Sequence, residues 1–242
     1  MIGYDRPLRP RWIYESLLIA KPGQRLSDLN KPFEGIAREL TGKEGKRKAR
    51  TVLFRCFIRD EQNQTKVRMV NILKDLTVQY GYEFMIPLYL FYLIGKTETL
   101  INISEHVLRL YSFGSEVNVQ FLKEKMADSF GDRDVVTRSA RAFIKTLEAF
   151  NIVISEGSKL FLKERLSIDE EQARIMFQLF AGEIINSPQV LLNHIPHTLF
   201  DYFHLPNIKT LAQKYNGQYW DYQQRVKDDL LVMYTVKPTS TP

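Results

Sequence analysis

The stretch that decides the fold is VVTRSARAFIKTLEAFNIVISEGSKLFL, which covers residues 135–162. Its first part predicts a helix over residues 135–150, because apolar residues recur there at helical spacing and form one stripe. The stripe consists of Ala140, Phe143, Ile144, Leu147 and Phe150. Its second part places two β-rich runs, 151–154 and 160–162, on either side of a glycine-bearing loop, and this pattern predicts a hairpin.

A second helix is expected immediately before this stretch. Residues 117–130 place Val119, Leu122 and Met126 on one face, and residues 131–134 supply a turn. Helix, turn, helix and hairpin in this order are typical of a winged helix-turn-helix. We therefore predict a winged helix over residues 116–166.

The flanking regions are expected to be mostly helical. Helical periodicity recurs over residues 11–20, 29–40, 46–59, 64–80, 83–94 and 101–111. We expect Gly81 to end the fourth of these helices and Pro87 to fall in the first turn of the fifth.

After Ser167 the acidic run 169–171 suits a helix start, and further helices are expected after Pro188, Pro196 and Pro206. A final strand near residues 230–234 is expected to pair with residues 218–222. The predicted fold is mainly α: an N-terminal helical bundle (1–115), the winged helix (116–166) and a smaller α/β C-terminal region (167–242).

The composition indicates a cytoplasmic protein. The single cysteine, Cys56, excludes a disulfide within the chain and favours a reducing compartment. The charged, proline-bearing residues 1–11 do not resemble a signal peptide. The longest apolar run, residues 84–94, is shorter than the roughly 20 residues that a membrane helix needs. We expect no membrane partner.

The positive charge is unevenly spread. Residues 1–60 contain 14 Lys and Arg against 7 Asp and Glu, a net charge of +7, and residues 117–166 have a net charge of +2. Residues 61–116 and 167–242 are slightly acidic, at −1 and −2. This asymmetry favours a polyanionic partner.

The predicted second helix of the winged unit is the candidate reading element. Off its apolar stripe lie Thr137, Arg138, Ser139, Arg141, Ala142 and Lys145, opposed by Glu148 late in the helix. Such cations can pair with guanine or phosphate in a major groove, and the hydroxyls can bond to phosphate. Lys159 in the hairpin is placed to reach an adjacent groove or the backbone. The alternative is that this face is simply the solvated side of a module that docks on another protein.

A second basic cluster lies in the predicted helix 46–59. Lys46, Arg47, Lys48 and Arg50 follow Lys43, with only Glu44 opposing them. Binding of a polyanion would relieve their mutual repulsion and release counterions. The alternative is an ordinary solvated helix face. No aromatic residue interleaves the cluster, so we expect duplex backbone contact rather than stacking on single strands.

Motifs for catalysis are not found. Gly95-Lys96-Thr97 lacks the glycine that a phosphate-binding loop needs five residues earlier, since position 90 is leucine. His194, His197, Asp201 and His204 have ligand-like spacing, but Pro196 interrupts them. Cys56 sits among apolar residues. We expect no catalytic residues, no metal and no cofactor. A transcription regulator with a ligand pocket behind residues 84–94, and a binder of RNA duplexes, remain alternatives.

Two stretches resemble the BrxA proteins of BREX phage-defence systems. They are residues 46–53 (KRKARTVL) and 136–153 (VTRSARAFIKTLEAFNIV), within a similar region of roughly residues 43–166. The resemblance implies a small accessory protein that binds double-stranded DNA, has no enzymatic activity of its own and works beside other defence proteins. The stretch before residue 43 and the aromatic run 84–94 have no counterpart in it.

Overall fold

The computed structural model describes residues 4–234, which are mainly helical, with a small sheet region towards the C-terminus. Helix makes up 56% of the structure, and the described residues form ten α-helices. The helices and helical turns are α1 (Pro10–Ile19), η1 (Leu26–Leu29), α2 (Asn30–Ile36), α3 (Lys43–Phe57), α4 (Ile72–Gly95), α5 (Glu98–Leu110), α6 (Val119–Phe130), α7 (Asp134–Ala149), α8 (Glu170–Leu179), the π-helical turn η2 (Phe180–Ile184), η3 (Leu192–His194), α9 (His197–Phe200) and α10 (Ile208–Lys214). The strands are β1 (Val153–Glu156), β2 (Lys159–Leu162), β3 (Leu166–Ser167), β4 (Gln189–Leu191), β5 (Phe203–His204), β6 (Trp220–Gln223) and β7 (Leu230–Met233).

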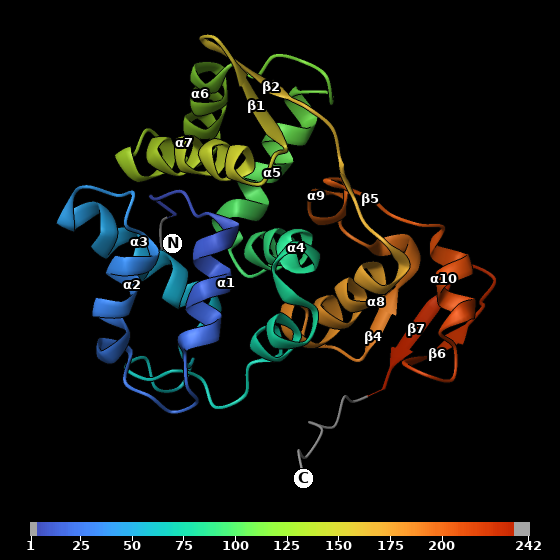
Figure 1. Ribbon diagram of the computed structural model, residues 1–242. Helices are drawn as coiled ribbons and strands as arrows, with labels where there is room; N and C mark the ends of the chain where they lie inside the picture. The colour runs from blue at the N-terminus through green and yellow to red at the C-terminus, as the bar shows by residue number, and fades with distance from the viewer. Residues whose placement is uncertain (1–3, 235–242) are drawn as a thin grey trace.

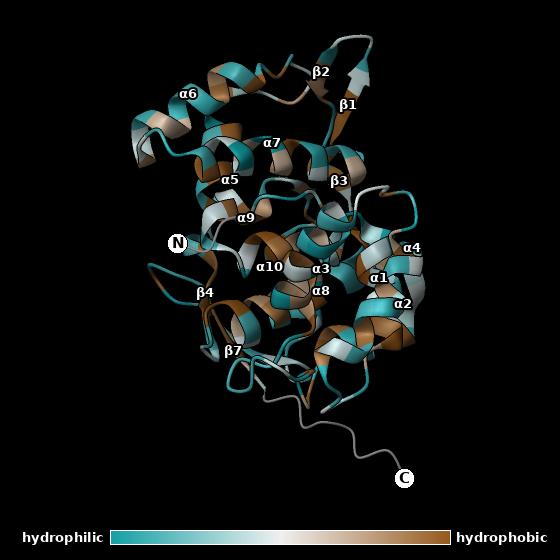
Figure 2. Cartoon of the chain, turned by 90° about the vertical axis from the view of Figure 1, so that its left-hand side faces the viewer, coloured by the Kyte–Doolittle hydropathy of each residue, from teal (hydrophilic) through white to brown (hydrophobic). Residues whose placement is uncertain are grey.

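The elements surround the central helix α4 (Figure 1). Helices α1–α3 lie on one side of it, α8–α10 and the strands β4, β6 and β7 on the other, and α5–α7 with the β1–β2 hairpin above. The buried apolar residues form one continuous core that runs from Tyr4 to Leu231. Figure 2 shows polar and apolar residues alternating along α6 and α7, as expected of amphipathic helices that cover a core.

Helix α4 replaces the two helices that were expected over residues 64–80 and 83–94. It differs from the prediction at the start of the first helix and at the break expected between them. The helix expected over 64–80 is wrong for residues 64–71, where the chain is a turn followed by a non-helical segment that forms single β-bridges from Lys66 to Arg25 and from Val67 to Arg59. The helix begins only after Asn71, whose side chain accepts a hydrogen bond from the Lys74 amide and so caps it. Gly81, at φ 77°, kinks the helix instead of ending it, and Pro87 lies inside the second half.

The second half of α4 is the centre of the core. Every side chain in residues 88–94 is fully buried. Phe91 packs edge-to-face on Phe200 and Phe203, which α9 and β5 contribute. Within the described residues no single helix has both the length and the apolar composition of a membrane span, although α4 and α5, bent by 105°, reach that composition when taken as a pair.

The helices expected over 117–130 and 135–150, and the hairpin after them, are confirmed as α6, α7 and β1–β2. Strands β1 and β2 pair antiparallel, with Val153 opposite Leu162 and Glu156 opposite Lys159. Glu116 adds a β-bridge to Phe161 on the outer side of β2. The turn contains Gly157 in the left-handed conformation, at φ 62°.

The C-terminal region was predicted in part. The acidic helix start is confirmed, because Asp169 and Gln172 form a reciprocal capping box at the start of α8. Strand β7 pairs antiparallel with β6, as expected. The helix expected after Pro188 is wrong: residues 189–191 form β4, the other neighbour of β7.

Candidate nucleic-acid interface

Helix α7 is buried over most of its circumference and exposed along one stripe. The exposed residues follow a spacing of four, three and four: Asp134, Arg138, Arg141 and Lys145. The opposite face is core and includes Phe143, Ile144 and Leu147. Three of the predicted site residues, Arg138, Arg141 and Lys145, therefore lie side by side on the solvent face.

Acidic neighbours balance part of this cationic stripe. Arg138 pairs with Asp134 one turn earlier, and the Lys145 ammonium lies 2.6 Å from the Glu148 carboxylate. Arg141 forms no ion pair with any residue from 4 to 234. The sequence interpretation counted only Glu148 as opposing; Asp134, at the i−4 position, opposes as well.

The two predicted hydroxyls have different environments. Thr137 is partly exposed and its hydroxyl lies 3.4 Å from the Arg133 carbonyl, to which it donates. Ser139 is fully buried and donates to the Val135 carbonyl at 2.7 Å. Its prediction as a nucleic-acid contact is wrong, because a buried hydroxyl that is already bonded within its helix cannot reach a ligand. Ala142 is also buried, so it does not belong to the exposed face.

The N-terminal segment is bonded to α7 at Thr146. The Tyr4 hydroxyl lies 2.6 Å from the Thr146 hydroxyl, and the Leu8 amide donates to the same oxygen at 3.1 Å. Tyr4 and Leu8 are fully buried. No sequence pattern indicates this contact, which joins residues more than a hundred positions apart.

The hairpin is fixed to α7 and to residue 116. The Ser155 hydroxyl in β1 donates to Glu148 of α7, and the Lys159 ammonium in β2 lies 2.8 Å from Glu116. The bond to Glu116 raises the pKa of Lys159, which keeps the ammonium charged. Burial raises the pKa of Glu148, but hydrogen bonds from Lys145 and Ser155 lower it by more, so the carboxyl is more acidic than usual. Lys159 is thus exposed on the hairpin, as predicted, with a carboxylate beside it.

The second basic cluster lies on α3, which runs below one end of α7 in Figure 1. Arg47 pairs with Glu44 at 2.9 Å, and the Lys46 ammonium lies 3.3 Å from the Glu34 carbonyl oxygen. Lys48 and Arg50 form no ion pair within the described residues. Burial lowers the pKa of Arg50. The cluster begins one turn inside the helix, because α3 starts at Lys43.

The rejected motifs have structural roles. Lys96 lies 2.9 Å from the Glu183 carbonyl and 3.4 Å from Glu61. Cys56 is buried, and burial raises the pKa of its thiol. His194 lies near Asp228 and His197 near Asp201, and no group of three possible metal ligands converges in residues 4–234.

The chain matches no family model, no curated protein and no solved structure.

Proposed function

We propose that the protein binds double-stranded DNA through the exposed stripe of α7. The observation that carries this proposal is the outward position of Arg138, Arg141 and Lys145 on one helix face, next to a hairpin. In this proposal α7 lies in the major groove, the hairpin is the wing, and Lys159 contacts the backbone.

The order of the elements supports a winged helix. Helix α5 is followed by the bridge at Glu116, then by α6, α7, β1 and β2. The bridge from Glu116 to Phe161 places a short segment of chain beside the two-stranded hairpin. Helix α7 would be the recognition helix of such a unit.

The intrahelical ion pairs on the stripe are compatible with phosphate binding. Exposed pairs at helical spacing contribute only about 0.3–0.5 kcal/mol each, so a phosphate or a guanine edge can replace Asp134 or Glu148 at small cost. Arg141 has no carboxylate partner in the described residues that a phosphate would have to replace. The exposed stripe carries three cations against two carboxylates, which favours modest, salt-sensitive affinity over tight binding.

Helix α3 supplies a second contact in this proposal. Lys46, Lys48 and Arg50 are cations without a carboxylate partner in the described residues. Arg47 is paired with Glu44, and this ion pair is exposed to solvent. They would bind the phosphate backbone beside the groove that α7 enters, without reading sequence.

The test is a titration of the protein with a labelled DNA duplex of about three helical turns at two salt concentrations. The double variant Arg138→Glu/Arg141→Glu is expected to bind at least about tenfold more weakly than the wild type, which corresponds to about 1.4 kcal/mol. Arg225→Glu/Lys227→Glu is the matched control, because both residues are exposed in the loop between β6 and β7. Equal affinity of the two double variants would contradict the proposal.

The same titration with an RNA duplex of equal length separates DNA from RNA as the partner. A deep, narrow major groove keeps a helix out of A-form RNA, so DNA is expected to bind more tightly. As the resemblance in residues 43–166 implies, the protein would act as a non-enzymatic accessory component of a phage-defence system. The rival role is an adaptor whose α7 face docks on another protein; it predicts no duplex binding at low salt.

A further inference from the structure

A groove of about 870 Å³ lies between the first half of α4, helix α8 and the end of the C-terminal sheet. One wall is the non-helical segment 67–71 with the turns of α4 before Gly81. The other wall is formed by Arg174, Ile175, Gln178 and Leu179 of α8, together with Gln218, Tyr219 and Tyr234. The groove shares no residue with the α7 stripe, so a role for it is independent of the proposed DNA binding.

The first wall exposes apolar side chains to an unusual degree. Met69, Val70 and Val78 line the groove and are 67%, 70% and 66% exposed. Ile72 and Leu76 lie between them and are partly exposed. Apolar side chains gathered in one concave site indicate a binding surface, whereas single exposed ones are ordinary.

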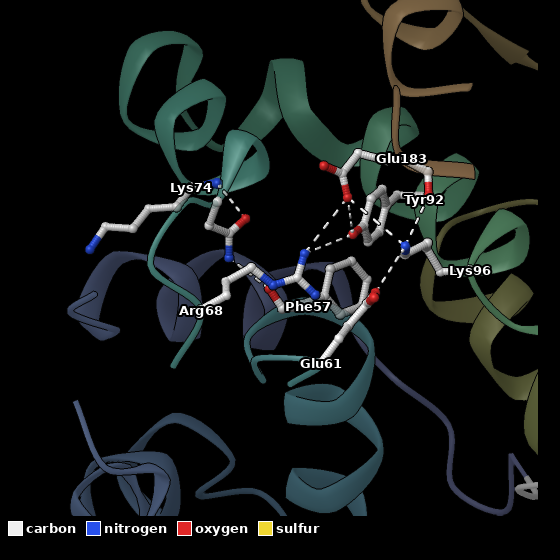
Figure 3. Close-up of polar contacts among 8 residues, drawn as sticks. Phe57, Glu61, Arg68, Lys74, Tyr92, Lys96 and Glu183 are labelled. Atoms are coloured by element: carbon white, nitrogen blue, oxygen red, sulfur yellow. Dashed lines mark hydrogen bonds and ion pairs between the residues drawn. The ribbon is translucent and has the colours of Figure 1, made fainter. Parts of the chain in front are cut away.

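Met69 and Val70 are held outward by polar anchors on both sides. Arg68 donates to the Tyr92 hydroxyl at 3.1 Å and lies 3.8 Å from Glu183 (Figure 3). Asn71 donates to the Phe57 carbonyl at 2.8 Å while its oxygen caps α4. The two residues between these anchors cannot turn inward without breaking them, so their exposure is built into the backbone path.

Both walls are fixed in position. In the first wall the Thr77 hydroxyl lies 2.8 Å from the Tyr89 hydroxyl, which ties the outer half of α4 to its core half. In the second wall Arg174 is buried, donates two hydrogen bonds to Glu171 and stacks 4.0 Å from the centroid of Tyr219. The groove is therefore preformed, and a ligand would lose little affinity to ordering it.

Positive charge surrounds the groove. Its lining contains Arg68, Lys74 and Arg174 against one carboxylate, Asp75. Arg68 is paired with Glu183 and Arg174 with Glu171, so Lys74 is the lining cation without an ion pair among the described residues. Lys21 and Lys66, directly beside lining residues, are exposed and form no ion pair in the described part of the chain. An occupant with acidic residues at its edges is favoured over a neutral or basic one.

We propose that this groove binds a short amphipathic helix of a partner protein, with its apolar face inward and acidic residues along its flanks. A helix lying between α4 and α8 would bury Met69, Val70 and Val78 by ordinary helix packing. A concave site does not fit a flat bilayer, and an apolar floor does not fit a nucleic acid.

The probe is a labelled synthetic helix with leucine at i, i+3, i+4 and i+7 and glutamate elsewhere, measured by fluorescence anisotropy against the full chain. One control peptide has the glutamates replaced by lysine, and a second has the same composition in scrambled order. The glutamate peptide is expected to bind at least about tenfold more tightly than either control.

Val70→Asp and Val78→Asp are each expected to lower the affinity for the glutamate peptide at least about tenfold. Val226→Asp is the matched control, because Val226 is fully exposed outside the groove. All three variants should keep the wild-type circular dichroism spectrum and duplex binding. Equal peptide affinity for Val78→Asp and Val226→Asp, or equal binding of all three peptides, would overturn the proposal.

Two further arms exclude other occupants. Sedimentation tests a second copy of the chain: self-association that Val78→Asp abolishes, without peptide binding, would overturn the proposal in favour of a dimer contact. Vesicles with anionic lipid test a membrane: vesicle binding lost in Val78→Asp, again without peptide binding, would overturn it in favour of lipid.

Discussion

Thr146 holds the N-terminal segment on α7. Its hydroxyl receives the Leu8 amide at 3.1 Å, lies 2.6 Å from the Tyr4 hydroxyl, and donates to the Ala142 carbonyl at 2.9 Å. All of these groups are buried. One hydroxyl therefore satisfies polar groups that would otherwise be shielded from water inside the core.

Thr146→Val is expected to lower the free energy of unfolding by about 2–6 kcal/mol. The substitution keeps the shape of the side chain but leaves the Tyr4 hydroxyl and the Leu8 amide unpaired, at about 1–3 kcal/mol for each buried group. Urea unfolding measures the change. Thr51→Val in α3 is the control, because that threonine is exposed, and it should stay within about 0.5 kcal/mol of the wild type. Similar losses in the two variants would contradict this role of Thr146.

Glu171 is expected to make stability depend on pH at the acidic end. Hydrogen bonds from Arg174, at 2.5 and 2.8 Å, hold the pKa of Glu171 below its ordinary value. The folded state therefore gains stability above the unfolded pKa of about 4.3 and loses it as the pH falls through the lower folded value.

Unfolding of the wild type and Glu171→Gln by urea, from neutral pH down to about pH 3, tests this. The difference between them should be largest near neutral pH and shrink in acid. A difference that is constant over this range would show that the carboxylate charge contributes nothing.

Among the predicted site residues, helical periodicity predicted the exposure of the cations correctly but did not predict which hydroxyl is buried. Arg138, Arg141 and Lys145 are exposed, as their long charged side chains require. Ser139 is small enough to be buried by bonding to its own helix, and an amphipathic pattern does not reveal this. The ion pairs with Asp134 and Glu148 could have been predicted from their i−4 and i+3 spacing.

The end of α4 and the π-helical turn η2 approach each other at Gly95. A methyl group at this position would overlap the side chain of Ile184. The same junction carries the Lys96 bond to the Glu183 carbonyl. Glycine and lysine in the Gly95-Lys96-Thr97 run are thus explained by close packing between two elements, and not by a phosphate-binding loop.

Gly95→Ala is expected to destabilise the protein by about 1–3 kcal/mol, because it overfills a packed contact. The matched control is Gly45→Ala in α3, where nothing lies within 4 Å of the added methyl group; helix propensity predicts a gain of up to about 1 kcal/mol there. Thermal unfolding measures both.

The double variant Gly95→Ala/Ile184→Ala checks the cause of the loss at Gly95. Removal of the Ile184 side-chain atoms should relieve the overlap, so the two substitutions together should cost less than the sum of the two single ones. If the losses of the two single variants add up exactly in the double variant, the overlap with Ile184 is not the cause of the loss at Gly95.

At the level of elements, local patterns predicted most helices, and long-range contacts decided the exceptions. The apolar residues in 64–71 have helical spacing, but the segment bridges to Arg25 and Arg59, which are distant in sequence. Residues 189–191 form a strand because β7 lies beside them. Neither partner can be identified from the segment itself.

At the scale of the whole molecule, the predicted parts share one core. The sequence predicted three regions in order, but the N-terminal segment between Tyr4 and Leu8 packs directly on α7 of the second region. Such a contact depends on two side chains meeting in space, and composition and periodicity carry no information about it. The groove was missed for the same reason, since its walls come from residues 67–80, 174–179, 218–219 and 234.

The salt dependence of duplex binding is expected to show whether α3 and α7 contact the same duplex. Three cations on α7 together with Lys159 predict a slope of log K against log salt of about −4, and adding the four on α3 predicts about −7. In the joint case Lys46→Ala/Lys48→Ala/Arg50→Ala should flatten the slope and weaken all duplex sequences equally. A slope that this variant leaves unchanged would assign the whole interface to α7.

The bonds from Tyr4 and Leu8 to Thr146 hold α7 in place, and this affects which DNA sequences the proposed interface would prefer. A recognition helix fixed along most of its circumference has almost no conformational entropy left to lose on association. It also cannot tilt to follow an unfavourable groove. For the proposed interface, the adjustment must then come from the DNA, so sites with easily deformed pyrimidine–purine steps are expected to be preferred even where no side chain touches the bases.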